Sequence, residues 1–286
     1  MTEDRFSRDN LMRLDPDLLR SIIRERTHHT LEHVVYSIMA GKAEPRPDPG
    51  RIVRLLLEAW DARGFDADLP DIRWAKTLLK LADTLAGGGK HAIDCEKPRR
   101  FSQTEQALVD ELLRQRRSIR HWTSEDVPQW MIRKVIEAAL WAPHACNLQT
   151  LRFIVLDHGS DPKLFSCPEF QGHRAKILVL QDTRAYDFFG VSIPERNRLL
   201  DCGAAVQNLL LMAHALGLGA VWSTFTAREI ELLNSAFGLP EHLVLRTYVA
   251  LGWPAQPVIP PGRILVEDAV LSWPGDPPIS LQDARR

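Results

Sequence analysis

The chain has 286 residues, of which 45% are hydrophobic and 26% charged, and its formal net charge at pH 7 is −1. This length and apolar content suffice for one large buried core or two modest ones. A net charge near zero gives no general attraction to nucleic acid or to a membrane surface, so we expect neither partner. Residues 1–10 lack the apolar stretch of a secretory signal, and no apolar run is long enough to span a bilayer. The sequence therefore predicts a cytoplasmic protein.

Four cysteines occur, at positions 95, 146, 167 and 202, and they form no C-x-x-C pair. This spacing favours neither a structural zinc site nor a disulfide scaffold. We therefore predict no bound metal, and we interpret each cysteine as a small buried apolar residue or an idle thiol.

Residues 1–100 are predicted to be helical. A main helix is expected to begin at Asp15-Pro16, because aspartate caps a helix N-terminus and proline is favoured at the first helical position. Two further runs with helical spacing of apolar residues cover 52–60 and 72–85, and a triple glycine at 87–89 ends the second. We interpret residues 1–100 as a helical extension that precedes a second domain of residues 101–286.

The second domain mixes helices and short strands without regular alternation. This order favours an α+β arrangement over a doubly wound sheet. Its longest helix is apolar on nearly all sides, which is typical of a helix in a core or against another subunit. The predicted helices span residues 104–114, 129–140 and 200–216, and the predicted strands span 153–156, 177–180 and 243–251.

The segment Arg116-Arg117-Ser118-Ile119-Arg120 concentrates three guanidinium groups and one hydroxyl. Guanidinium groups make forked contacts with phosphate, and serine adds a short hydrogen bond. In an extended segment, alternation would aim Arg116, Ser118 and Arg120 to the same side. A solvated basic patch is the other interpretation, since charged runs commonly lie on the surface.

Two further segments follow predicted helices. In residues 143–149, the amides of Asn147 and Gln149 can bind the polar edge of a planar heterocycle, although a capped helix end explains them as well. Residues 217–225 begin with glycines that allow close backbone approach to a ligand; the alternative is a helix stop that leads into a loop. Arg263, in a proline-rich C-terminal segment, carries no signal by itself.

Together and in this order, these segments resemble the nitroreductase family of FMN enzymes over about residues 105–270. The resemblance implies an α+β fold with a central, mostly antiparallel sheet flanked by helices. It also implies a homodimer whose active sites are shared between the subunits. Residues 28–33 faintly resemble a helix of longer family members that are encoded in polysaccharide clusters.

The resemblance also assigns cofactor-binding roles to individual residues. No catalytic residue is assigned beyond Ser223 and Thr224, because the flavin itself carries the hydride or electron chemistry. By this resemblance, the FMN phosphate end is held by Arg116, Arg117, Ser118, Arg120 and Arg263; the segment from the other subunit supplies Pro143, His144 and Asn147; and the loop that passes the flavin N5 edge supplies Trp222, Ser223 and Thr224.

The implied function is a two-step transfer of electrons or hydride through FMN, from NADH or NADPH to a small-molecule acceptor. The chain departs from the family pattern at His144, where most relatives have serine, and at Thr150-Leu151, where they usually have Pro-Trp. One alternative is therefore a flavin-binding protein without NAD(P)H turnover. A second is the branch that contains the dehalogenase and the flavin-fragmenting enzyme of dimethylbenzimidazole synthesis, because the Ser223 and Thr224 hydroxyls resemble the N5 donor that favours one-electron chemistry there.

A remote alternative is a zinc hydrolase. His29-x-x-Glu32-His33 matches the inverted zincin pattern, in which two histidines four apart on a helix bind zinc and the glutamate activates water. The sequence places no third ligand, and the motif lies outside the part that resembles an enzyme. A packed or polar helix face is therefore the favoured interpretation.

Overall fold

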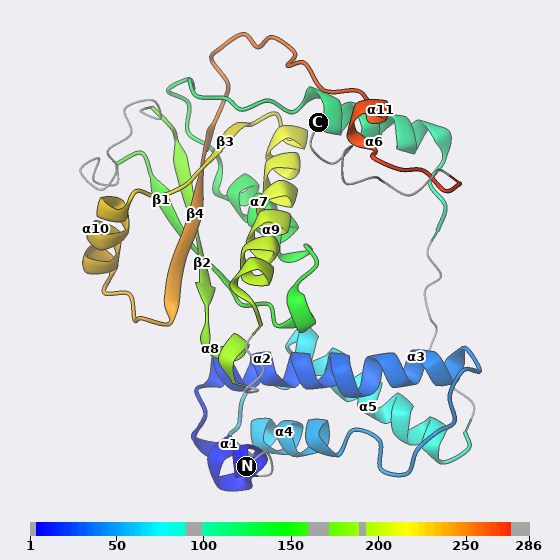
Figure 1. The fold of residues 1–286 in the computed structure, drawn as a ribbon. Helices are drawn as coiled ribbons and strands as arrows, with labels where there is room; N and C mark the ends of the chain where they lie inside the picture. Colours follow the sequence, from blue (N-terminus) through cyan, green and yellow to red (C-terminus); the bar gives the residue numbers. More distant parts are fainter. Residues whose placement is uncertain (1–3, 90–98, 160–171, 189–192, 276–286) are drawn as a thin grey trace, which may run out of the picture. The chain divides into compact units, whose positions relative to one another are not determined.

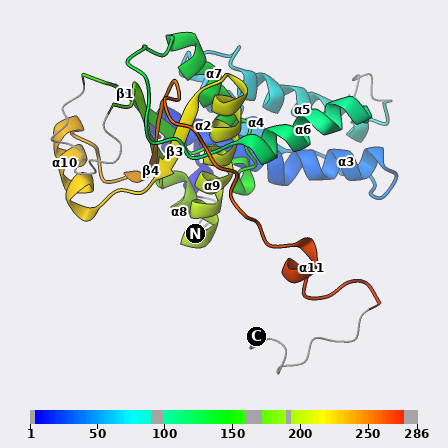
Figure 2. The same cartoon turned by 90° about the horizontal axis from the view of Figure 1, so that it is seen from above.

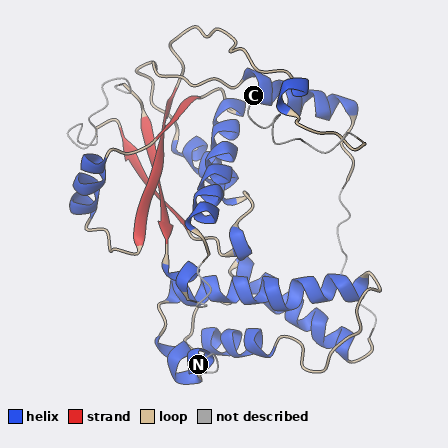
Figure 3. Ribbon diagram, in the orientation of Figure 1, coloured by secondary structure: helices blue, strands red, loops and turns tan. Residues whose placement is uncertain are grey.

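The computed structural model describes residues 4–89, 99–159, 172–188 and 193–275. It divides into a compact unit of residues 1–256 and a C-terminal unit of residues 257–286. Within the described ranges, residues 4–89 contain helices and no strand, and every strand lies after residue 150 (Figure 3). The predicted α+β class is therefore confirmed. Cys95, Cys167 and most of the predicted connector at 92–100 fall outside the described residues.

The N-terminal region is built around one long helical rod. Helix α2 (Pro16–Thr27) continues through a π-helical turn, η2 (His28–Glu32), into α3 (His33–Met39). The Asp15 carboxylate accepts hydrogen bonds from the N–H groups of Asp17 and Leu18, at 3.0 and 3.2 Å, so it caps α2 as predicted. Two further helices, α4 (Arg51–Ala62) and α5 (Pro70–Ala86), pack against this rod (Figure 1).

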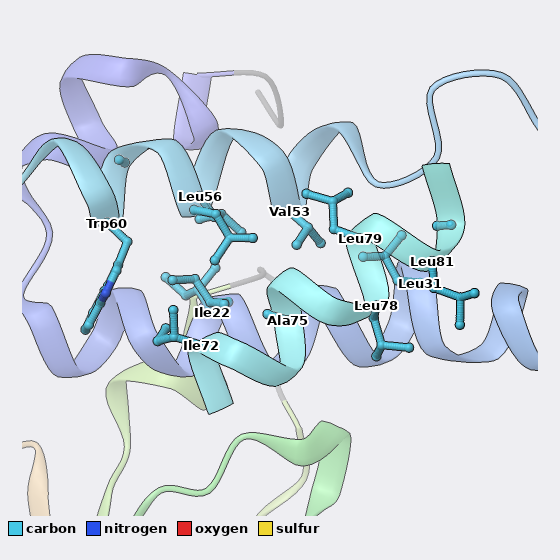
Figure 4. Close-up of a cluster of buried hydrophobic side chains, with 14 of the residues drawn as sticks. Ile22, Leu31, Val53, Leu56, Trp60, Ile72, Ala75, Leu78, Leu79 and Leu81 are labelled. Atoms are coloured by element: carbon cyan, nitrogen blue, oxygen red, sulfur yellow. The ribbon is translucent and has the colours of Figure 1, made fainter. Parts of the chain in front are cut away.

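These helices share a hydrophobic core (Figure 4). Ile22 of α2, Leu56 of α4 and Ile72 of α5 are fully buried in it. Burying a side chain of this size contributes about 1.5–3 kcal/mol. The N-terminal helices thus possess a core of their own, which is compatible with the predicted extension; the boundary near residue 100 stays a prediction.

The second part contains a four-stranded antiparallel sheet in the order β1-β2-β4-β3, as far as the described residues show. Strand β2 is buried along its whole length because both faces of the sheet are covered. Ile177 and Val179 share a core with α7 and α9, whereas Leu178 and Leu180 face the side on which α10 packs (Figure 2). These elements are β1 (Leu151–Asp157), β2 (Ala175–Asp182), β3 (Gly219–Ser223), β4 (Leu243–Gly252), α7 (Gln129–Leu140), α9 (Glu195–Ala215) and α10 (Ala227–Phe237).

The predicted loop at residues 217–225 is corrected by the structure. Helix α9 ends in a Schellman motif, in which Gly217 has φ +79° and the N–H of Leu218 donates to the carbonyl of Ala213 at 2.9 Å. The chain then forms β3 at once, paired with β4. The glycine at position 219 allows Ile119 to pack closely against the start of β3, because a Cβ there would lie 2.7 Å from the Ile119 side chain. The helix stop was foreseen; the strand was not, because it is short and begins directly after glycine.

Helix α9 is also longer than predicted. It begins at Glu195, and its polar first turn carries no apolar signal. One face of α9 is buried against the sheet and α7, while Leu199 and Leu200 are 51% and 69% exposed. The remaining elements are η1 (Asp4–Phe6), α1 (Arg8–Arg13), α6 (Gln103–Gln115), η3 (Ala145–Asn147), α8 (Arg184–Asp187) and α11 (Val266–Ala269). Among the described residues, no helix combines the length and apolar character needed to cross a membrane.

Candidate functional site

The basic segment at residues 116–120 runs beside β3. Ser118 forms a parallel bridge with Ala220, and the N–H of Ile119 donates to the Ala220 carbonyl at 3.1 Å. Ile119 is buried, whereas Ser118 and Arg120 are exposed on either side of it. Ser118 and Arg120 are therefore free of the core packing that fixes Ile119.

The end of this segment is fixed by a second set of hydrogen bonds. The N–H groups of Arg120 and His121 both donate to Oε1 of Gln256, at 2.8 and 2.9 Å. The indole N–H of Trp122 donates to the Gly219 carbonyl at 2.8 Å. The backbone between α6 and α7 is thus held in place while the side chains of Ser118 and Arg120 face outward.

Positive charge accumulates where this segment passes the end of α9. Burial lowers the pKa of His214, and the guanidinium groups of Arg116 and Arg117 lower it further. The Arg117 Nη1 group donates to the carbonyls of Arg114 and Arg116, but its Nε atom is buried without a hydrogen-bond partner in the described chain. A buried donor of this kind calls for a partner.

The loop at residues 143–149 adopts a strained backbone. Cys146, Asn147 and Gln149 have φ values of +53°, +53° and +50°, which are uncommon for residues other than glycine. A left-handed residue with a Cβ costs about 1–2 kcal/mol, so the surroundings must stabilise this conformation. Leu148, between them, is fully buried, and its carbonyl accepts two hydrogen bonds from Arg24 of α2.

His144 lies at the centre of a buried polar network. Its Nδ1 atom is 3.1 Å from Oδ2 of Asp201, and its Nε2 atom accepts from the N–H of Thr150 at 3.2 Å. Because a backbone N–H only donates, Nε2 bears the lone pair and Nδ1 carries the proton that faces Asp201. Burial lowers the pKa of His144, although Asp201 opposes this, so the ring is neutral at neutral pH.

Tyr186 completes this network. Its hydroxyl donates to Asp201 Oδ2 at 2.9 Å and accepts from Thr150 Oγ1 at 2.9 Å and Gln181 Nε2 at 3.1 Å. Burial raises the pKa of Tyr186, so the phenol stays protonated. Sequence reasoning missed Asp201, Tyr186 and Gln181. The available signal was a carboxylate inside a largely apolar helix, together with polar residues at the end of a buried strand.

His144 and Asp201 of this network line a cavity of about 650 Å³. It brings together three of the predicted site residues, Pro143, His144 and Trp222. Trp222 is 44% exposed, and its indole N–H donates to Thr247 Oγ1 at 2.5 Å, which fixes the orientation of the ring. The lining residues are Pro143, His144, Ala145, Leu199, Leu200, Asp201, Gly203, Ala204 and Trp222.

Other predicted residues lie elsewhere. Asn147 lines a different cavity of about 460 Å³, together with Gln149 and Asp71. Ser223 ends β3, and Thr224 is exposed in the loop that follows. Arg263 belongs to the C-terminal unit, where it is exposed and donates to the Gly262 carbonyl at 3.0 Å, so its convergence with Arg120 stays a prediction.

The predicted zinc motif does not form a ligand set. Glu32 pairs with His28 at 2.7 Å, and His29 lies 3.7 Å from Glu25. Across the residues that the structure describes, no group of three or more His, Cys, Asp or Glu side chains is placed to hold a metal ion. Residues 28–32 instead form the π-helical turn η2, whose Leu31 is buried in the core of the N-terminal helices.

Comparisons with known proteins converge on one family. The model of the nitroreductase family matches residues 113–166 and 163–253. A protein of Methanothermobacter thermautotrophicus, provisionally named NADH dehydrogenase/NAD(P)H nitroreductase, is 33% identical over 157 residues, which is 52% of this chain and 78% of the relative. A relative with the same provisional name from Archaeoglobus fulgidus is 34% identical over 146 residues, or 49% of this chain and 81% of the relative.

The comparison with solved structures finds the same family. It is a provisionally named nitroreductase from Desulfovibrio desulfuricans in complex with FMN, 35% identical, with a TM-score of 0.50 over 59% of this chain and 98% of that one. The family match begins at residue 113, so the faint likeness of residues 28–33 to polysaccharide-cluster members is not borne out.

Proposed function

Because the chain belongs to the nitroreductase family, we propose that it is an FMN-dependent oxidoreductase that works in two steps, taking electrons or hydride from NADH or NADPH and passing them to a small-molecule acceptor. The FMN complex of the Desulfovibrio neighbour and the names of the archaeal relatives support this proposal. The observation that carries it in this chain is the outward-facing basic segment at residues 116–120, with the unpartnered Nε of Arg117 beside it.

The donors of this segment fit a phosphate group. Arg116, Arg117 and Arg120 supply guanidinium groups, and Ser118 supplies a hydroxyl on the exposed side of the segment. Such donors match a phosphate dianion in both charge and geometry. In the proposal they hold the FMN phosphate, and Arg263 of the C-terminal unit joins them.

The residues at the end of β3 offer an aromatic side chain and two hydroxyl groups to a planar ring. Trp222 is held by Thr247, and the hydroxyls of Ser223 and Thr224 follow it where the strand ends. When bound, FMN supplies the redox chemistry itself, and the protein supplies binding and orientation. In the proposal, Ser223 and Thr224 donate hydrogen bonds near the flavin N5 edge, and Trp222 borders the ring.

We further propose a homodimer with shared sites. The exposed leucines of α9 adjoin the cavity that contains Pro143 and His144, so a second copy seated on α9 would cover it. In the proposal Pro143, His144 and Asn147 of each subunit serve the site of its partner.

Reconstitution with FMN tests the function. The purified protein, as isolated and after incubation with FMN, is expected to be yellow, to be bleached by NADH or NADPH under argon, and to be reoxidised by at least one acceptor in a panel of nitroaromatics and quinones. A colourless protein that takes up no FMN contradicts the proposal. A yellow protein that neither nucleotide bleaches supports the second candidate, a flavin-binding protein without turnover, which His144 favours because both of its ring nitrogens are already engaged.

A further inference from the structure

Arg24 links the N-terminal helices to the loop at residues 143–149 through hydrogen bonds. Its side chain is only 5% exposed. Nη2 and Nε donate to the carbonyl of Leu148, at 2.8 and 3.3 Å, and Nη1 donates to Oδ2 of Asp71 at 2.7 Å. Nη2 also donates to Ser21 Oγ at 2.8 Å. One guanidinium group therefore ties α2, α5 and the loop together.

Asp71 fixes the orientation of Arg24. Its carboxylate, on α5, also accepts two hydrogen bonds from Arg20, both at 2.7 Å. A buried guanidinium is stable only when it is paired and hydrogen-bonded. Arg24 therefore cannot turn away from the Leu148 carbonyl without giving up contacts that its burial requires.

The loop depends on support from outside its own residues. Leu148 lies between the left-handed residues Asn147 and Gln149, and its side chain packs with Leu18 of α2 and Tyr186 of α8. Helices α2 and α8 are in contact (Figure 1). Both the side chain and the carbonyl of Leu148 are thus held partly by the N-terminal region.

Two ion pairs hold the neighbouring elements to the same helix. Arg184 of α8 lies 3.1 Å from Asp15, the cap of α2. Arg152 of β1, close after the loop, lies 3.6 Å from Asp17. The start of α2 is therefore attached near the loop at two points besides Arg24.

We propose that the N-terminal helical region positions the loop of the cofactor site: Arg24, oriented by Asp71, holds the Leu148 carbonyl and thereby fixes the left-handed backbone that presents Asn147. This inference rests on the proposed function, in which Asn147 belongs to an FMN site. Arg24 itself touches no cofactor, so it is a positioning residue.

The test compares Arg24→Met with Arg20→Met in the full chain. Methionine keeps an unbranched, largely apolar side chain at position 24 but removes every donor, whereas Arg20 donates its hydrogen bonds to Asp71. In the flavin-free protein, amide hydrogen exchange at residues 145–150 is expected to be roughly tenfold faster or more in Arg24→Met, the scale of one lost hydrogen bond from a charged donor. The FMN Kd is expected to rise by a similar factor, and Arg20→Met should leave both quantities within about twofold of the wild type.

A second variant, Arg24→Lys, keeps the test decisive if Arg24→Met fails to fold. Arg24→Lys keeps the charge beside Asp71, but one ammonium cannot reproduce the fork that serves both Asp71 and Leu148, so an intermediate effect is expected. Unchanged loop exchange in both Arg24 variants overturns the inference, as does an equal effect of Arg20→Met. If the wild type binds no FMN, the proposed function fails, while loop exchange in the flavin-free variants still decides whether Arg24 holds the loop.

Discussion

The side chain of His144 forms hydrogen bonds that fix the loop at residues 143–149 to its surroundings. Where most relatives of this family are expected to have serine, the imidazole here engages Asp201 on one nitrogen and the Thr150 N–H on the other. Both nitrogens are used inside the protein, so His144 shapes the wall of the cavity rather than offering a free base to a substrate. Thr150, the other position expected to depart from the family pattern, supplies this N–H donor.

The pH dependence of stability should reveal the neutral state of His144. Burial lowers its folded pKa below the ordinary 6.5, so on acidification the unfolded chain binds a proton before the folded protein does. Its contribution to stability is therefore present above about pH 6.5 and decreases below it, by at most about 1.4 kcal/mol per pH unit. His144→Asn keeps an N–H donor toward Asp201 but cannot titrate, and should flatten the fall in Tm between about pH 7.5 and 5.5.

An exposed histidine provides the control for this measurement. His158→Asn removes an imidazole that is exposed beyond the end of β1, and its Tm should follow the wild-type pH profile. A His144→Asn profile that parallels the wild type would mean that the pKa of His144 is the same in the folded and unfolded states.

Arg120 allows a direct test of the phosphate assignment. Its side chain is exposed, while its backbone is fixed by Gln256. Arg120→Ala should therefore leave the Tm of the flavin-free protein within about 1 °C and raise the FMN Kd roughly tenfold or more, as expected when a charged donor to phosphate is lost. Arg114→Ala, which removes an exposed arginine paired with Asp110 on α6, is the matched control. Equal FMN affinity in the two variants would show that Arg120 does not contact the phosphate.

At the scale of elements, Asp71 joins two helices through a pH-sensitive contact. Burial raises its pKa, but the hydrogen bonds from Arg20 and Arg24 outweigh burial and bring the pKa below 3.8. A carboxylate with a depressed pKa stabilises the fold above its unfolded pKa, and this contribution is lost as the pH falls through the folded value. Asp71→Asn should therefore lower the free energy of unfolding by about 3 kcal/mol at neutral pH, the scale for breaking a buried pair.

The pH series separates this contribution from general destabilisation. The deficit of Asp71→Asn should be constant from about pH 7 to 5 and shrink below about pH 4 as the wild-type carboxylate takes up its proton. Asp61→Asn breaks an exposed pair with Lys76 and should cost about 0.5 kcal/mol or less. An Asp71→Asn deficit that persists unchanged at the lowest pH would argue against the ion pair as its source.

Elements with strong local signals were predicted well. Asp15-Pro16 marked the start of α2, and the burial of β2 along its whole length agrees with its continuous apolar run. Strand β3 and the first turn of α9 were missed, because their form depends on tertiary partners. The backbone of β3 pairs with β4 and with Ser118, which lies about a hundred residues earlier in the chain.

The site was predictable only in part, for a similar reason. A basic cluster, an amide-containing loop and a glycine-led segment after a helix could be recognised individually, and their order suggested a family. The contact between Asp201 and His144 joins residues far apart in sequence, and neither residue indicates the other. The role of Arg24 could not be predicted either, because the pattern of an amphipathic helix does not indicate which arginine will donate to the carbonyl of Leu148.

At the scale of the whole molecule, helix α9 exposes apolar side chains to solvent. Its inner face is buried against the sheet, yet Leu199 and Leu200 project from the other side and border the cavity with Trp222. Adjacent exposed leucines beside a cavity of this kind are typical of an interface. The same surface thus connects the proposed dimer with the proposed cofactor site.

Leu200→Glu tests both proposals together. A carboxylate buried in a subunit interface without a partner costs several kcal/mol, so the dimer dissociation constant should rise by about a hundredfold or more. Sedimentation should then show a monomer at micromolar concentration, and FMN should be lost with the dimer, because in the proposed arrangement each site includes the loop of the partner. Phe237→Glu introduces the same charge at an exposed aromatic residue of α10, on the opposite face of the sheet, and should remain dimeric and yellow. A Leu200→Glu monomer that holds FMN as tightly as the wild type would show that one subunit suffices for the site, and a wild-type monomer would exclude the shared arrangement altogether.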